Sequence, residues 1–129
     1  MVLLAVGSTA QAESGALSIE LNKLESEDHS CRAYLVVTNK STTTYQVIKL
    51  DLVLFQPDGV IGRRFAVDLG PLKSDKRTVK LFDIDTVPCD QVGSVLINDV
   101  LECTSESGPI PDCLAAITPS SLAKAQLSK

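Results

Sequence analysis

The sequence predicts an all-β protein, an antiparallel immunoglobulin-like β-sandwich of about six to eight strands. Apolar and polar residues alternate with a period of two in successive short segments, as they do on the two faces of a sheet. Turn residues separate these segments, and no long helical pattern lies between them. The chain has 129 residues, of which 44% are hydrophobic and 22% charged, and this size and balance suit a single globular domain.

The first three expected strands show the alternation most clearly. Residues 17–22 alternate without interruption, and the alternation in 31–39 puts Cys31 in phase with the buried face. The third run spans 45–55 and ends at the turn 56–59, where Pro and Asp-Gly favour a reversal of the chain. In that run the expected inward residues are Ile48, Leu50, Leu52 and Leu54, and the expected outward residues are Lys49 and Asp51.

Three weaker runs follow at 60–67, 77–84 and 92–100, each bounded by Gly, Pro, Ser or Asp. The chain is expected to finish in a short helix or tail. Ser120 or Ser121 can cap such a helix, with Leu122 and Leu127 near one face.

The N-terminal residues resemble the end of a secretory signal peptide. A short apolar run, 2–6, is followed by small residues at Ala10 and Ala12, which fit the pattern read by signal peptidase, although no positively charged region precedes the run. The alternative is a buried apolar N-terminus. We therefore divide the chain into a signal remnant (1–12), a β-sandwich domain (13–103) and a disulfide-tied C-terminal extension (104–129), and expect a periplasmic or secreted protein.

The four cysteines are expected to form disulfides, because exported proteins fold in an oxidising compartment. Three pairings are possible. Cys31 opens the second expected strand, and Cys89 directly precedes the sixth. Even-numbered strands of an antiparallel Greek key start at the same end of the sandwich. Cys31 and Cys89 are therefore expected to pair. Cys103 and Cys113 then bracket a Gly-Pro loop and form the second bond. Zinc or thioredoxin-like redox chemistry is disfavoured because the sequence contains no Cys-x-x-Cys.

Few residues suggest catalysis or metal binding. The only histidine, His29, follows Glu25, Glu27 and Asp28 in a polar turn, which could hold a cation weakly but lacks the spacing of a calcium loop. A second possible cation site is formed by Asp83, Asp85 and Asp90. For this group and for the turn at 25–29, we favour the interpretation that the acidic side chains are simply solvated. No Gly-x-Ser-x-Gly motif occurs. We therefore expect no catalytic residues, no metal site and no cofactor.

Charge limits the expected partners. The net charge of -4 would repel a polyanion, so nucleic acid is disfavoured, and no segment is long and apolar enough to be a membrane span. Basic residues nevertheless gather in the middle of the chain and could form a docking surface for an acidic partner or anionic envelope component. The alternative is a solvated strand face that protects an edge from aggregation. These residues are Arg63, Arg64, Lys73, Lys76, Arg77 and Lys80.

The stretches 36–41 and 48–61 resemble the immunoglobulin-like or fibronectin-like modules of exported bacterial proteins. In those modules an Asn-x-Ser/Thr corner follows one strand, here Asn39-Lys40-Ser41, and the next strand ends in phenylalanine before an Asp-Gly hairpin. The resemblance covers roughly 16–100 in outline. It implies a sandwich fold without shared catalytic residues, and the whole chain resembles small exported proteins of Gram-negative bacteria, which implies a periplasmic location.

Together these features predict a non-catalytic exported β-sandwich that acts through its surface, as an adaptor or structural subunit in the cell envelope. Its partner would be a protein or an envelope component, and the protein itself a monomer or weak oligomer. The alternatives are a periplasmic small-ligand or metal-binding protein and an enzyme. A concave apolar pocket would favour the binding protein, and a perturbed acid and base in one cleft would favour the enzyme.

Overall fold

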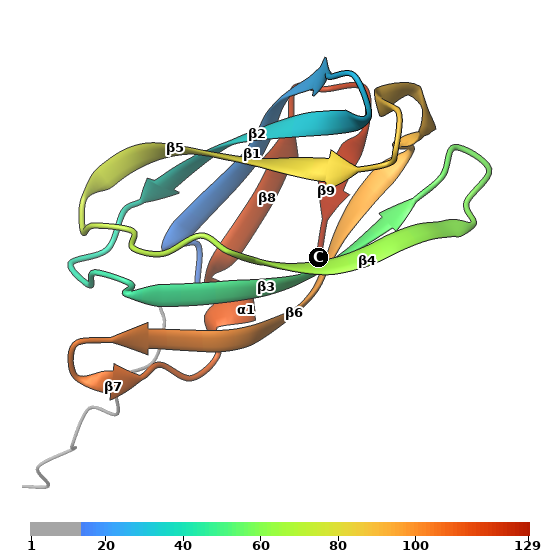
Figure 1. Ribbon diagram of the computed structural model, residues 1–129. Helices are drawn as coiled ribbons and strands as arrows, with labels where there is room; N and C mark the ends of the chain where they lie inside the picture. The colour runs from blue at the N-terminus through green and yellow to red at the C-terminus, as the bar shows by residue number, and fades with distance from the viewer. Residues whose placement is uncertain (1–13) are drawn as a thin grey trace, which may run out of the picture.

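The computed structural model describes residues 14–129 and is all-β, as predicted (Figure 1). The expected signal remnant, 1–12, lies outside the described residues. Within the described part, no helix has the length and apolar character needed to cross a membrane. The elements are β1 (Leu17–Ser26), β2 (Ser30–Asn39), β3 (Val47–Phe55), β4 (Ile61–Asp68), β5 (Lys76–Asp85), the 3-10 helix η1 (Cys89–Gln91), β6 (Ser94–Ser105), β7 (Gly108–Pro109), α1 (Cys113–Ala116), β8 (Ile117–Ser121) and β9 (Gln126–Ser128).

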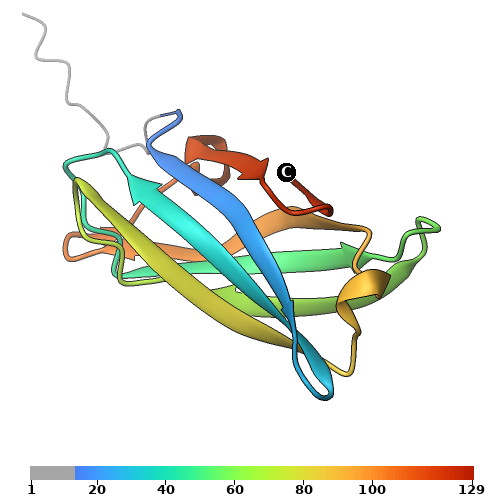
Figure 2. The same cartoon turned by 90° about the horizontal axis from the view of Figure 1, so that it is seen from above.

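The strands form two sheets that face each other across the core (Figures 1 and 2). One sheet has the order β5-β2-β1-β8, and the other has the order β4-β3-β6-β7 with β9 also paired to β6. The predicted β-sandwich is confirmed, but its sheets are not antiparallel throughout, because β8 runs parallel to β1 and β9 runs parallel to β6. The chain leaves α1 beside the start of β1, where Ile117 pairs with Leu17, and therefore follows β1 in the same direction.

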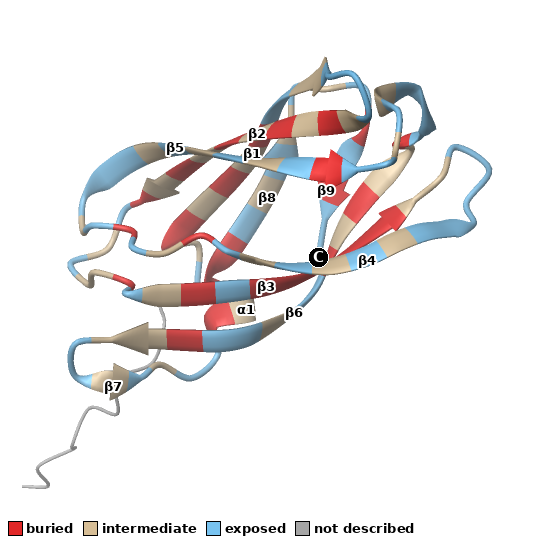
Figure 3. Ribbon diagram, in the orientation of Figure 1, coloured by how far each residue is buried: buried red, intermediate tan, exposed pale blue. Residues whose placement is uncertain are grey.

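The predicted alternation places the core correctly (Figure 3). Leu17, Ile19 and Leu21 of β1 are buried, and each second residue of β2 from Cys31 to Val37 is buried against them. The opposite sheet contributes Ile48, Leu50, Leu52 and Leu54 of β3, as the sequence predicts.

The C-terminal residues are part of the sandwich rather than an extension of it. Residues 117–121 and 126–128 are strands, and Ile117 and Leu127 are buried in the core. The prediction of a helix after Ser120 or Ser121 is wrong, because both residues lie in β8. The Ser121 hydroxyl donates to backbone carbonyls instead of capping a helix. The short helix that does form is α1, directly after the Cys103–Cys113 loop.

The Asn39 corner connects the end of β2 to the chain that leads into β5. The Asn39 side chain is only 1% exposed. Its amide donates to the carbonyls of Thr43, Leu72 and Lys73 at 2.8, 3.1 and 3.2 Å, and its Oδ1 accepts from the Ser41 amide and hydroxyl. Because a buried amide must find such partners, this asparagine fixes both loops at the beginning of β5.

Candidate binding surface on strand β5

Both disulfides are present with the pairing that the strand order suggests. Cys31 bonds Cys89, with a Cα separation of 4.9 Å, and Cys103 bonds Cys113, with a Cα separation of 6.6 Å. No free cysteine is left among the described residues. The first bond fastens the start of β2 to η1, just after β5, and so holds one end of the β5–β2 pair.

The six basic residues do not form one continuous stripe. Arg63 and Arg64 lie on β4, which belongs to one sheet, whereas Lys76, Arg77 and Lys80 lie on β5, at the edge of the other. Lys73 lies in the connection between these strands. The chain changes sheet between β4 and β5, so the outer faces of the two strands lie on opposite sides of the sandwich.

The two arginines of β4 already have partners within the chain. Arg63 Nη1 donates to the Asp85 carbonyl at 2.6 Å and thereby connects β4 to the end of β5. Arg64 makes a two-pronged contact with Asp51, from Nε to Oδ1 at 2.9 Å and from Nη2 to Oδ2 at 2.8 Å.

Asp51 lies on the outer face of its sheet, as predicted, but it is only 4% exposed rather than solvated. Asn98 also donates to its Oδ2, at 3.0 Å. The hydrogen bonds from Arg64 and then Asn98 hold the pKa of the Asp51 carboxyl below its ordinary value. The carboxylate is thus kept ionised by three donor contacts, which is the environment of a structural ion pair rather than of a proton-accepting base.

An exposed apolar patch lies on the outer face of β5 and β2. Val79 and Leu81 of β5 are 59% and 56% exposed, and they pair across the strands with Val36 and Tyr34 of β2. We call these four residues, together with Arg77 at the end of the row, the β5 surface. Large apolar side chains side by side on a sheet face, with charged residues around them, are typical of protein-binding surfaces.

Ion pairs border one end of the β5 surface. Arg32 Nε donates to Asp83 Oδ1 at 2.8 Å, and Arg32 Nη1 lies 3.2 Å from Glu27 Oε1. The Tyr34 hydroxyl donates to Glu25 Oε1 at 3.0 Å. The bond from Arg32 holds the pKa of Asp83 below its ordinary value, so the charges at this end of the patch are largely neutralised within the chain.

The opposite end of the β5 surface carries cations without such partners. Within residues 14–129, neither Arg77 nor Lys80 forms an ion pair. Arg77 is exposed on the outer face, whereas Lys80 is half-buried and shares the core-facing side of β5 with Phe82 and Ile84. Three of the six predicted docking residues, Lys76, Arg77 and Lys80, therefore remain together on one strand.

Two carboxylates near the turn before β2, those of Glu25 and Glu27, form ion pairs within the chain. Within the described part of the chain, no group of three or more His, Cys, Asp or Glu side chains is placed to hold an ion. Glu25 and Glu27 instead pair with Lys23 and Arg32 on the sheet face, and the His29 carbonyl accepts a hydrogen bond from the Thr86 amide.

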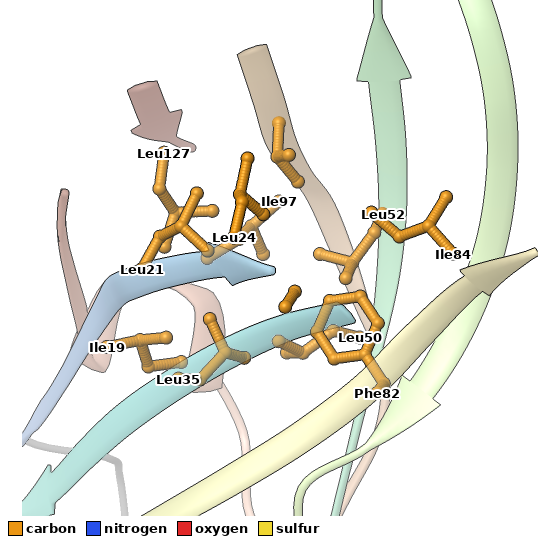
Figure 4. A pocket seen from close by; sticks show the side chains of 12 residues that line it. Ile19, Leu21, Leu24, Leu35, Leu50, Leu52, Phe82, Ile84, Ile97 and Leu127 are labelled. Carbon is orange, nitrogen blue, oxygen red and sulfur yellow. The ribbon is translucent and has the colours of Figure 1, made fainter. Parts of the chain in front are cut away.

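A small cavity lies between the sheets, and Figure 4 shows that its walls are aliphatic and aromatic side chains from both sheets. Its volume is about 10 Å³, far below the several hundred Å³ typical of small-molecule sites. It is a packing gap rather than a pocket that could accept a drug-sized ligand. The lining residues with labels are Ile19, Leu21, Leu24, Leu35, Leu50, Leu52, Phe82, Ile84, Ile97 and Leu127.

Comparison with known proteins supports the fold. No known family profile matches the sequence, and no curated protein sequence is significantly similar to it. Among solved structures, the chain is similar to IrmA from Escherichia coli, with a TM-score of 0.61 over 80% of this chain and 89% of that chain. The two sequences are only 13% identical, so the similarity shows a shared β-sandwich fold and nothing about activity.

Proposed function

We propose that this protein is a non-catalytic, exported β-sandwich that serves as an adaptor or structural subunit of the cell envelope. It binds a protein partner through the β5 surface. The observation that carries this proposal is the exposure of Val79 and Leu81 beside each other on an edge strand. Burying such a pair against a partner is favourable by about 25 cal/mol for each Å² of apolar surface removed from water.

The arrangement around this pair supports a protein partner. Interfaces commonly combine an apolar centre with a polar rim, and here Arg77 lies on one side of Val79 while the Arg32–Asp83 pair lies beyond Leu81. An aromatic ring next to the centre, that of Tyr34, adds the type of side chain that contributes strongly to binding.

Two disulfides indicate an oxidising compartment outside the cytoplasm. The signal-like pattern of the first residues supports export, and the resemblance to exported proteins of Gram-negative bacteria supports the periplasm as the site of action. We therefore place the proposed binding event in the envelope.

Site-specific photocrosslinking in cells tests this proposal. A photoreactive amino acid at Leu81 should give a discrete crosslinked protein, because this side chain would lie inside the interface. The same amino acid at Leu122, which is 73% exposed in the β8–β9 loop, is the matched control and should not give that product. The product should also disappear when Val79→Asp is combined with the probe at Leu81. Equal crosslinking from both positions, or none from Leu81, would count against the β5 surface as the binding site.

A further inference from the structure

Among the strands of residues 14–129, none pairs with the outer side of the β5 backbone. It is the terminal strand of the β5-β2-β1-β8 sheet, it is 10 residues long, and it contains no proline (Figures 1 and 2). Within residues 14–129 its only strand partner is β2. A free edge of this kind can accept an extended segment from another chain, through backbone hydrogen bonds.

The side chains of β5 show which segment would fit. On the outer face, Val79 and Leu81 would lie opposite apolar residues of an added strand, and Arg77 would lie opposite an acidic one. On the core-facing side, Lys80 pairs with buried Leu35 of β2, is half-buried, and forms no ion pair in the described chain. A carboxylate facing Lys80 would neutralise this charge where it is partly removed from water.

A second copy of this chain fits less well. If two β5 strands paired antiparallel about Lys80, Val79 would meet Leu81 and Arg77 would meet Asp83 of the other copy, which is favourable. The same register places the two Lys80 ammonium groups opposite each other, and like charges directly across a strand pair are destabilising. A charged residue that points inward on an edge strand is a known means of preventing self-pairing.

We propose that β5 binds an extended acidic segment of a partner protein as an additional strand, and that Lys80 both selects this segment and prevents β5 from pairing with itself. The proposal rests on the proposed function, in which the β5 surface is the binding site. The segment carries apolar residues opposite Leu81 and Val79, and acidic residues opposite Lys80 and Arg77.

A synthetic strand provides a direct test on the full-length protein. The probe is the capped peptide Thr-Val-Glu-Val-Thr-Glu-Thr, whose first glutamate faces Lys80 in the antiparallel register; the comparison peptide has lysine at that place. Titration followed by amide NMR should shift the signals of β5, and the glutamate peptide should bind about twofold to fivefold more tightly, as expected for one cross-strand charge pair. Lys80→Glu should reverse the preference, whereas Lys124→Glu, in the exposed β8–β9 loop, should leave it unchanged.

Absence of β5 shifts with millimolar peptide, or equal affinity for both peptides, would overturn the proposal. If the probe at Leu81 nevertheless captures a protein in cells, the proposed function survives and only strand addition fails.

Sedimentation measurements test the second role of Lys80. The unmodified protein should remain monomeric, and Lys80→Thr should associate in a concentration-dependent way because the repulsion is removed. Dimers of the unmodified protein, with amide hydrogen exchange slowed over 77–83, would show that a second copy occupies the edge. Persistent monomers of Lys80→Thr would show that Lys80 does not prevent self-pairing.

Discussion

The two edges of the β5-β2-β1-β8 sheet are protected in different ways. β8 has 5 residues, and Pro119 at its centre lacks the amide donor that a further strand would need. β5 has 10 residues, two exposed apolar side chains and a complete set of backbone donors. Its protection depends on the charge of Lys80. Protection by proline is permanent, whereas protection by charge can be removed by a partner with the opposite charge, so only one edge of this sheet is suited to regulated pairing.

Each edge is also held by its own disulfide. Cys31–Cys89 connects β2 to the turn after β5 and closes a chain separation of 58 residues. Cys103–Cys113 connects β6 to the helix before β8 and closes a separation of 10. Because the two loops differ in size, removal of the two disulfides should lower the free energy of unfolding by different amounts. This is the largest effect expected in a comparison of the two edges.

Removing the disulfide at the β5 edge should cost more stability than removing the one at the β8 edge. Cys31→Ala with Cys89→Ala should lower the free energy of unfolding by about 4 kcal/mol, and Cys103→Ala with Cys113→Ala by about 3 kcal/mol, because the longer loop restricts the unfolded chain more. Guanidinium unfolding of both double variants measures the difference. A larger loss for the Cys103–Cys113 pair would mean that local packing around β8, not loop length, decides the order.

A buried residue on each edge strand should contribute comparably to stability. Ile117→Ala in β8 and Ile84→Ala in β5 each remove an isoleucine side chain that is at most 2% exposed, so each should cost about 3 kcal/mol. Urea unfolding gives both values, and Leu122→Ala, at an exposed loop position, should change stability by less than about 0.5 kcal/mol. A negligible effect of Ile117→Ala would restore the interpretation of the C-terminal residues as an extension outside the sandwich.

The smallest expected difference concerns pH. β8 carries no ionisable side chain, whereas Asp83 of β5 has a pKa below its ordinary value because Arg32 donates to it. A lowered pKa stabilises the fold above the ordinary carboxyl pKa, and this contribution is lost as the pH falls through the lower, folded-state value. Acid should therefore loosen the β5 edge before the β8 edge, as followed by amide exchange.

Arg32→Met should raise the pKa of Asp83 toward its ordinary value in an NMR titration. The pKa of Asp51 should stay low in the same variant, because Arg64 and Asn98 still contact it. If the pKa of Asp83 were unchanged in this variant, a group other than Arg32 would be responsible for lowering it.

The sequence predicts the first six strands, and the buried faces of the first three, because a period of two is a local property of the chain. The disulfide pairing follows from the strand order in the same way. β8 is missed for a local reason as well, because Ser120 or Ser121 suggests a helix cap and the pairing with β1 that holds the chain extended there is not visible locally. β9 is three residues long, and its partner, β6, is likewise set by the fold.

The candidate site is predicted less completely, since it depends on which strands become neighbours. The split of the basic residues results from the change of sheet between β4 and β5, which no periodicity reveals. The burial of Asp51 depends on irregular pairing of β3 with β6 beside it, which brings Asn98 into reach. Alternation alone places Asp51 on the outer face but cannot show that it is covered.

If the protein is exported as proposed, the parallel pairing of β1 with β8 also constrains how it folds during translocation. The first strand finds its outer neighbour at a sequence separation of 100 residues, as in the contact between Leu21 and Ser121. When a chain crosses a membrane with its N-terminus leading, β1 therefore emerges long before its partner β8. The sheet can be completed only after β8 has crossed. Contacts of such long range are slow to form, so an exported chain with this fold would stay accessible to chaperones until β8 has crossed.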